Sequence, residues 1–427
     1  MSVPWAPGAV PVLGHLRQLL ADPTTFLTSL PAHGDLVRIR LGTRTTYVVC
    51  RPELVSRVLI EDRRHYDKGG PFFDNVAQFF GDGLATCPDA RQPRLRRLVQ
   101  PAFARSRLDG YADLIGREAA AAVEPWREGQ VLDAYPAMQM LAMRITVATM
   151  FAGWNNAPGA SAETLGQVDT LVSGAFLRMV APGIARLPLP ATRRFERARS
   201  ALYARIEHTV AGYRDTGTDR GDLLSMLLAG DGTGDGLSAG ELRDQVMTMF
   251  IAGIGTTAAM LAWTLNFLAL DPELDAAVAA EARHAERGGS LLSDVITETF
   301  RIRPAAWLFS RRTVIGTQLG GHRLPAGSDV LISPYVQHHL PEVFPDPERF
   351  DPGRWAGTAK RPMISFGGGA RQCVGRDFSL MTITLVLASI LRTWQLRPAG
   401  PGVRMSGRSI LEPRDLRLRL VRRPEPR

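Results

Sequence analysis

One thiol stands out as a candidate metal ligand, because Cys373 follows a glycine-rich turn and precedes a long apolar run in the segment Phe366-Gly-Gly-Gly-Ala-Arg-Gln-Cys373-Val-Gly375. A thiol at the start of a helix ionises easily, since the exposed N–H groups there favour the thiolate. One thiolate is a good ligand for a soft metal centre. The glycines allow the backbone to approach a large flat ligand, and Arg371 can pair with an acidic group on that ligand. The loop therefore predicts a site for a flat, acidic, metal-bearing cofactor.

A long helix is predicted over residues 238–271. Ser238 and Glu241 have the spacing of a capping box, and Asp271-Pro272 predicts the end of the helix. Residues 245–270 carry no charge. Glycines, threonines and an asparagine interrupt this stretch and basic flanks are lacking at both ends, so it is interpreted as a buried central helix and not as a membrane span.

Small and hydroxyl-bearing residues lie together in the middle of that helix, in the order Ala252-Gly253-Ile254-Gly255-Thr256-Thr257. A threonine hydroxyl can compete for a backbone carbonyl, so this segment could open a groove that holds a water molecule. The alternative is a close contact with another helix, made by the small residues.

The remaining pattern predicts a mainly α protein with small β-sheets, in which residues 1–427 form one domain. A proline- and glycine-rich entry segment covers residues 1–34, and a hairpin is predicted from residues 36–41 and 45–49. Helices dominate from residue 52 to 228, with interruptions at Pro71, Pro88, Pro136 and residues 182–190. Clean alternation over residues 416–420 predicts a strand near the C-terminus.

The composition indicates a soluble cytoplasmic protein. The chain has three cysteines, a small and odd number that does not suit a disulfide framework and fits a reducing cytosol. Neither a secretory signal nor a membrane anchor is recognised. The net charge is +9, and only two of the 51 basic residues, Lys68 and Lys360, are lysine. This bias suggests a GC-rich bacterial genome.

A cluster of arginines precedes residue 108 and could steer an acidic protein partner. No zinc-finger spacing or RNA-binding motif accompanies it, so nucleic acid is the weaker interpretation. The cluster consists of Arg91, Arg94, Arg96, Arg97, Arg105 and Arg107.

The pattern Phe-x-x-Gly-x-Arg-x-Cys-x-Gly resembles the haem-binding loop of the cytochrome P-450 family, and the resemblance runs from about residue 7 to residue 422. It implies the P-450 fold, with a long central helix over the haem. It also implies haem b with Cys373 as the axial thiolate ligand of the iron, in a loop (residues 366–375) that includes Phe366, Gly369 and Gly375.

The resemblance further implies that three arginines bind the two haem propionates. The planar guanidinium group of arginine can bind a carboxylate through two hydrogen bonds. These are Arg371, Arg311 and Arg96, with Gln92 at the position where many relatives carry histidine or tryptophan. Two further motifs, Glu298-Thr-Phe-Arg301 and Pro347-Glu-Arg349-Phe350, resemble the family's structural Glu-Arg-Arg triad. The triad predicted from them is Glu298, Arg301 and Arg349.

Residues 252–257 resemble the oxygen-activation segment of the family, with Ala252 and Gly253 at its start. Thr256 matches the threonine that orients a catalytic water. Where the family usually has an acid that relays protons, this chain has Gly255. General acid catalysis typically raises a reaction rate about 10²–10⁴-fold. Water chains or the substrate could supply the protons, peroxide could be the oxidant, or the reaction could differ from simple hydroxylation.

Apolar residues at the family's pocket positions suit a hydrocarbon-like ligand. Segments 304–307 and 186–195 resemble bacterial P-450s that oxidise sesquiterpenes. The predicted pocket residues are Phe72, Phe73, Phe79, Phe80, Phe250, Ala252, Trp307 and Leu308.

Together these features predict a soluble bacterial haem-thiolate monooxygenase that inserts one atom of O₂ into an apolar, terpenoid-like molecule. The resemblance implies electrons from NAD(P)H through ferredoxin and ferredoxin reductase, with the acidic partner on the basic proximal face. Two alternatives stay open. One is a haem-thiolate enzyme of atypical chemistry, either peroxide-driven or an isomerase, and the other is a non-catalytic haem sensor.

Overall fold

The structure is a computed structural model, and it describes residues 2–68, 76–77, 80–152, 162–180, 187–230, 236–284, 289–356, 362–407 and 409–424. The α-helices are α1 (Leu16–Ala21), α2 (Pro23–Ser29), α3 (Pro52–Ser56), α5 (Gln92–Val99), α6 (Arg105–Val123), α7 (Ala134–Met150), α8 (Ala162–Val180), α10 (Pro190–Thr216), α11 (Leu223–Ala229), α12 (Ala239–Leu270), α13 (Pro272–His284), α14 (Gly289–Ile302), α15 (Pro334–His338) and α16 (Arg376–Thr393). The strands are β1 (Leu36–Leu41), β2 (Arg44–Val49), β3 (Tyr66–Asp67), β4 (Val131–Asp133), β5 (Phe309–Thr313), β6 (Thr317–Leu319), β7 (His322–Leu324), β8 (Asp329–Ile332), β9 (Trp394–Pro398), β10 (Arg404–Gly407), β11 (Leu411–Arg414) and β12 (Arg417–Arg422).

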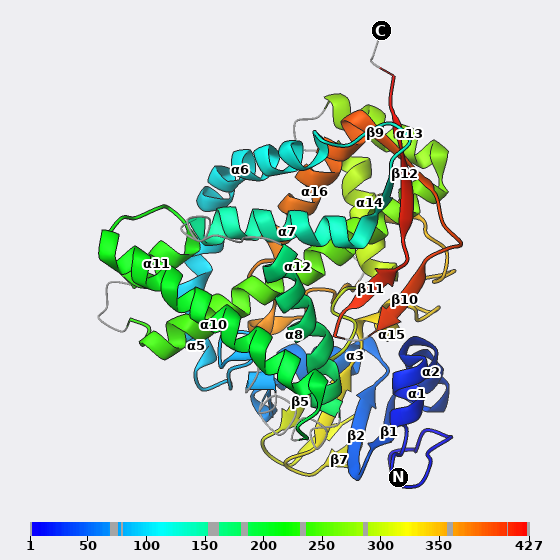
Figure 1. Cartoon of the computed structure of the whole chain (residues 1–427). Helices are drawn as coiled ribbons and strands as arrows, with labels where there is room; N and C mark the ends of the chain where they lie inside the picture. Colours follow the sequence, from blue (N-terminus) through cyan, green and yellow to red (C-terminus); the bar gives the residue numbers. More distant parts are fainter. Residues whose placement is uncertain are drawn as a thin grey trace.

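Helix α12 lies at the centre of the helical part, surrounded by α7, α10, α14 and α16 (Figure 1). The predicted capping box is confirmed, since the Ser238 hydroxyl accepts from the Glu241 N–H and the Glu241 carboxylate accepts from the Ser238 N–H. The helix ends at Leu270, before Asp271, as predicted. Within the described residues, α12 is the one helix that is apolar and long enough to cross a membrane. Of its most apolar 18-residue stretch, 78% is buried inside the fold. It is the core helix that its sequence predicts.

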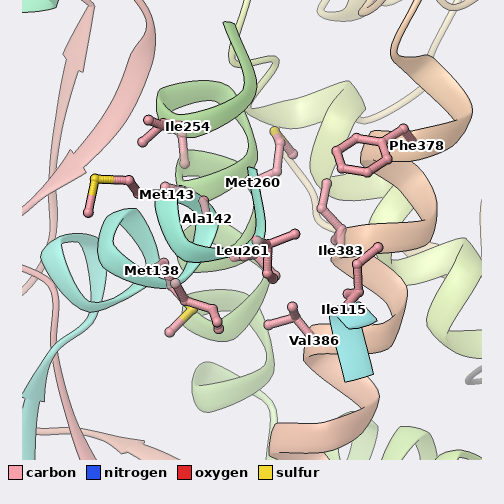
Figure 2. Packing of buried hydrophobic residues seen from close by; sticks show 14 of the residues in the cluster. Ile115, Met138, Ala142, Met143, Ile254, Met260, Leu261, Phe378, Ile383 and Val386 are labelled. Atoms are coloured by element: carbon pink, nitrogen blue, oxygen red, sulfur yellow. The ribbon is translucent and has the colours of Figure 1, made fainter. Parts of the chain in front are cut away.

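The main core is formed where α7, α12, α16 and α6 meet. Figure 2 shows apolar side chains from these four helices pointing toward one another, among them Met138, Ala142, Met143, Ile254, Met260, Leu261, Phe378, Ile383, Val386 and Ile115. Burial of such side chains contributes roughly 25 cal/mol per Å² of apolar surface. This packing fixes which face of α12 is left for other contacts.

A five-stranded sheet lies beside the N-terminal helices, with the strand order β1-β2-β8-β5-β3. The predicted hairpin forms its edge, and the Leu41–Arg44 pair shortens the turn to two residues, with Gly42 at φ +62°. At the other edge β3 runs antiparallel to β5 and pairs Asp67 with Arg312. This pairing brings residues near 67 close to residues near 311.

The C-terminal part adds a three-stranded sheet, β4-β12-β9, and the β10–β11 hairpin. The predicted C-terminal strand is observed as β12, shifted by one residue at its start. The loop of the β10–β11 hairpin reaches the helices, because the Ser409 hydroxyl donates to the Val172 carbonyl of α8 at 2.5 Å. The hairpin is therefore anchored to α8, and β11 also packs against α12.

The expected interruption at Pro136 is wrong. Pro136 lies in the first turn of α7, where a missing backbone N–H leaves no helical hydrogen bond unmade. The interruptions at Pro71 and at residues 182–186 lie outside the described residues. That residues 1–427 form one domain stays a prediction.

Candidate active site

The cysteine loop is closed by its own backbone. The Cys373 N–H donates to the Phe366 carbonyl at 2.9 Å, and the Gln372 N–H donates to the Gly369 carbonyl at 3.0 Å. Gly369 has φ +62°, and a Cβ atom there would collide with the Leu59 carbonyl. A glycine is required at this position, because no L side chain fits both the backbone angle and the close approach. The loop is thereby pressed against residues 57–61.

Cys373 lies three residues before α16 and is accessible to solvent. The surrounding protein still raises the pKa of the thiol through burial, while the Gly375 N–H and the Arg96 and Lys68 cations act in the opposite direction. The expected easy ionisation is therefore opposed in the protein alone. A bound metal cation would hold the sulfur as thiolate.

Helix α5 reaches the cysteine loop with two of the predicted residues. Gln92 is buried, and its Nε2 donates to the Ala370 carbonyl at 2.8 Å. Arg96 donates through Nη1 to the same carbonyl at 3.1 Å and to the Gln372 carbonyl at 2.7 Å. Both side chains fix the loop that carries Cys373.

The other two predicted arginines lie close to each other. Arg371 donates through Nε to the Asp89 carboxylate at 2.7 Å, and its Nη1 lies 3.6 Å from the Cys87 sulfur. Arg311 on β5 is buried, and its pKa is lowered to about 10 by burial and by the neighbouring charge of Arg371. Two neighbouring positive charges in a buried place favour the binding of an anionic ligand, such as a propionate.

This donor set fits a haem. Cys373 would supply one sulfur ligand for iron, and Arg96, Arg311 and Arg371 would supply cations for the carboxylates. Phe366 anchors the start of the loop on α14, since its ring centroid lies 4.8 Å from that of Phe300. A Cβ atom at Gly375 would lie 3.5 Å from the Phe103 ring, an ordinary contact.

The middle of α12 separates into two faces. Ala252 is exposed and Thr256 is half-buried, and the Thr256 hydroxyl donates to the Ala252 carbonyl at 2.8 Å. On another side, a Cβ atom at Gly253 would lie 2.9 Å from the Thr146 hydroxyl oxygen of α7. Gly253 therefore makes the close helix contact that was the alternative interpretation, whereas Ala252 and Thr256 border open space.

Gly255 is buried against the β10–β11 loop. A Cβ atom at this position would lie 3.2 Å from the Cδ1 atom of Ile410. A side chain at position 255 would require the Ile410 methyl to shift by a few tenths of an ångström. The absence of the usual acid is thus matched by an apolar neighbour from a distant part of the chain, which sequence motifs alone do not indicate.

Two of the predicted pocket residues are core residues. Trp307 is 1% exposed and packs in the cluster around the N-terminal helices, and Phe250 is fully buried with its ring 6.2 Å from that of Phe151. Both rings are core residues in this structure, and their place in a substrate pocket stays a prediction. Leu308 and Phe80 are half-buried. Phe72, Phe73 and Phe79 lie outside the described residues.

The structural triad contains a different second arginine from the one predicted. Glu298 is fully buried, and its carboxylate accepts hydrogen bonds from Nε and Nη2 of Arg301 at 2.9 and 2.8 Å. The third member is Arg354, whose Nε donates to Glu298 at 2.9 Å. Arg349 is exposed and contributes only its backbone carbonyl, which accepts from Arg301 at 3.0 Å. The motif missed Arg354, which lies beyond it in the short 3-10 helix Pro352–Trp355.

The predicted arginine cluster does not form a single basic face. Arg91 pairs with Asp82 at 2.8 Å, Arg94 pairs with Glu241 at 2.7 Å, and Arg96 turns inward to the cysteine loop. Arg97, Arg105 and Arg107 are exposed. The basic surface near the loop is therefore smaller than the sequence indicates.

Comparison with known proteins identifies the family of the chain. The cytochrome P450 family model matches residues 4–414, and the chain belongs to this family. It is therefore a P450 monooxygenase of the mainly α fold, and the family implies haem iron held by a cysteine thiolate, with electrons from a redox partner.

Three relatives are similar over nearly their whole length. Cyclooctatin synthase of Streptomyces melanosporofaciens is 41% identical, over 99% of this chain and 95% of its own. Cyclooctat-9-en-7-ol 5-monooxygenase of the same organism is 39% identical, over 93% and 91%. Pentalenene oxygenase of Streptomyces avermitilis is 38% identical, over 98% and 97%.

Proposed function

We propose that this P450 inserts one atom of O₂ into a C–H bond of an apolar terpenoid, in the secondary metabolism of a bacterium. The observation that carries the proposal is the similarity, over more than 90% of each chain, to relatives whose names state oxygenation of pentalenene and of cyclooctat-9-en-7-ol. Ala252 and the Gly255–Ile410 contact support an apolar substrate, because no carboxylate stands at this point of α12.

Several side chains have assigned tasks in this proposal. Cys373 would hold the iron, Arg96, Arg311 and Arg371 would bind the propionates, and Gln92 would keep the loop in place. The haem, when bound, supplies the reductive activation of O₂. Thr256 holds its proton toward the Ala252 carbonyl, so its oxygen can accept a hydrogen bond from a water beside the substrate.

We propose NAD(P)H as the electron source, through a ferredoxin reductase and a ferredoxin in the cytoplasm. The acidic ferredoxin would dock beside the cysteine loop, at the exposed Arg97 and Arg105. Charge complementarity of this kind raises association rates and is screened by salt.

The proposal is tested with the reduced protein, carbon monoxide and a set of cyclic terpenes. We expect the red-shifted absorption band of thiolate-ligated haem, its loss in Cys373→Ala, and oxygenated product that carries label from ¹⁸O₂. Thr256→Val should lower the product formed per NADPH roughly tenfold or more, whereas Thr256→Ser should retain most of it. Full coupling in Thr256→Val would contradict the role given to this hydroxyl.

A second candidate, atypical chemistry, is favoured by Gly255, because glycine stands where the family usually has a proton-relaying acid and a Cβ atom there would crowd Ile410. Product formed with hydrogen peroxide in place of NADPH and partners would support a peroxide-driven enzyme. Product formed without O₂ or peroxide would support an isomerase. Ligand binding without turnover under any of these conditions would identify a sensor.

A further inference from the structure

A polar cavity of about 420 Å³ lies between two short helices and the β6–β7 hairpin. The helices cover Arg57–Glu61 and Arg63–His65 and precede β3. The residues that line the cavity are Arg57, Asp62, His65, Gly316, Thr317, Gln318 and Arg323. Among the described residues, none from the cysteine loop or from α12 belongs to this lining. The cavity is therefore separate from the candidate active site.

Hydrogen bonds join the two walls of the cavity. The Val314 N–H donates to the His65 carbonyl at 2.9 Å, and the Nδ1 atom of His65 lies 3.0 Å from the Thr317 hydroxyl oxygen. The first helix is also pressed against the cysteine loop, since the Leu59 carbonyl leaves no room for a Cβ atom at Gly369. Walls fixed in this way hold their shape before a ligand arrives, which lowers the entropic cost of binding.

Positive charge exceeds negative charge in the cavity. Arg57 donates through Nε and Nη2 to the same oxygen of Asp62, at 3.0 and 2.8 Å. In the described part of the chain, the Nη1 group of Arg57 has no hydrogen-bond partner. Arg323 is exposed and forms no ion pair with a carboxylate of the described residues. One carboxylate thus faces two guanidinium groups, and the excess charge favours an anion.

The side chains of the lining indicate the class of anion. Sites for apolar ligands are mostly lined by hydrophobic side chains, and this lining, as far as the structure describes it, has none. Guanidinium groups match the oxygens of phosphates and carboxylates, while Thr317 and Gln318 add a hydroxyl and an amide donor. A phosphate group carries up to about two negative charges and three acceptor oxygens, so it uses more of these donors than a carboxylate does.

We propose that this cavity binds the phosphate group of a small soluble molecule, with Arg57 and Arg323 as its charged partners. Asp62 has a defined part in the site. It orients Arg57 through two hydrogen bonds, and its charge opposes the bound anion. The inference requires neither haem chemistry nor a terpenoid substrate, so it stands apart from the proposed reaction.

The test is isothermal titration calorimetry of the holoprotein with inorganic phosphate and with inorganic diphosphate at low ionic strength. The variant Arg323→Gln should bind both ions about tenfold more weakly, because it loses charged hydrogen bonds to the anion. Arg64→Gln is the matched control, since Arg64 is an exposed neighbour that undergoes the same change of charge and does not line the cavity. Its affinity should change less than about twofold, because solvent screens a charge outside the site.

The variant Asp62→Asn should change affinity in the opposite direction. Its amide oxygen can still accept from Arg57, whereas the opposing charge is gone, so both ions should bind about threefold more tightly or better. Far-ultraviolet circular dichroism verifies that all variants keep the wild-type fold.

Three results would contradict the proposal. Equal weakening in Arg323→Gln and Arg64→Gln would show that general surface charge attracts the ion. Absence of binding heat for both ions in the wild type would show that the cavity takes no phosphate. Sedimentation with vesicles of phosphatidic acid, without binding of either free ion, would assign the cavity to a lipid headgroup instead of a soluble ligand.

Discussion

The Nε atom of Arg354 lies 2.9 Å from the Oε1 atom of Glu298 and donates to it. The same buried carboxylate accepts from Arg301 twice, from the Asp351 N–H and from the Trp355 indole N–H. Arg301 also donates to the carbonyl of His338, and the His338 ring accepts from the N–H of Ile364 at the start of the cysteine-loop segment. The network thus connects α14 to the loop that carries Cys373.

Arg354→Leu should destabilise the holoprotein by about 3–5 kcal/mol, because it leaves part of a buried negative charge uncompensated. Arg349→Ala is the matched control, since that side chain is exposed, and it should change stability by less than about 0.5 kcal/mol. Urea unfolding followed by the Soret band measures both. Equal losses in the two variants would return the triad to Arg349.

The substitution Gly255→Asp should lower the free energy of unfolding by about 1–3 kcal/mol. The Cβ atom of the new side chain would lie 3.2 Å from the Cδ1 atom of Ile410 in a packed region. In an Ile410→Ala background the same substitution should be tolerated and should raise the product formed per NADPH, because an acid then stands beside Thr256. Ile410→Ala alone serves as the control. If the single and double variants behaved alike, the contact would not be what keeps an acid out.

Gly253→Ala should cost about 1–2 kcal/mol, although alanine is the better helix former by about 1 kcal/mol. The reason is the 2.9 Å approach of its Cβ atom to the Thr146 hydroxyl. Thermal unfolding of Gly253→Ala, Thr146→Ala and the double variant gives the coupling between the two positions. We expect the loss to disappear in the Thr146→Ala background, and strict additivity would contradict the contact.

Two buried histidines make stability depend on pH. Burial lowers the pKa of His338 and of His339 to about 3, from an ordinary value near 6.5. The unfolded chain therefore takes up protons first, so their contribution is complete above about pH 6.5 and is lost as the pH falls toward 3. At pH 5 each histidine should cost on the order of 2 kcal/mol relative to pH 7.5.

The substitution His338→Gln tests this dependence, because glutamine can still accept from the Ile364 N–H. Urea midpoints of wild type and variant are compared between pH 7.5 and 5. The variant should show the flatter decline. Parallel declines would mean that His338 is not the group that takes up the proton.

Local signals in the sequence were sufficient for the features that depend on neighbouring residues. The capping box of Ser238 and Glu241, the end of α12 before Pro272 and the hairpin around Gly42 all follow from short-range hydrogen bonds and backbone angles. The Cys373 loop belongs to the same group, because its turn is closed between residues 366 and 373.

Tertiary structure decided the features in which distant segments meet. Periodicity marks α12 as buried on all sides, but only packing shows that Gly253 meets Thr146, that Gly255 meets Ile410 and that Ala252 borders open space. In the same way, the sequence shows only that Phe250 and Trp307 are apolar. The tertiary structure buries Phe250 in the main core and Trp307 in the cluster around the N-terminal helices. Short-range patterns specify how a segment folds, whereas the neighbour that each face receives depends on the register and angle at which segments pack.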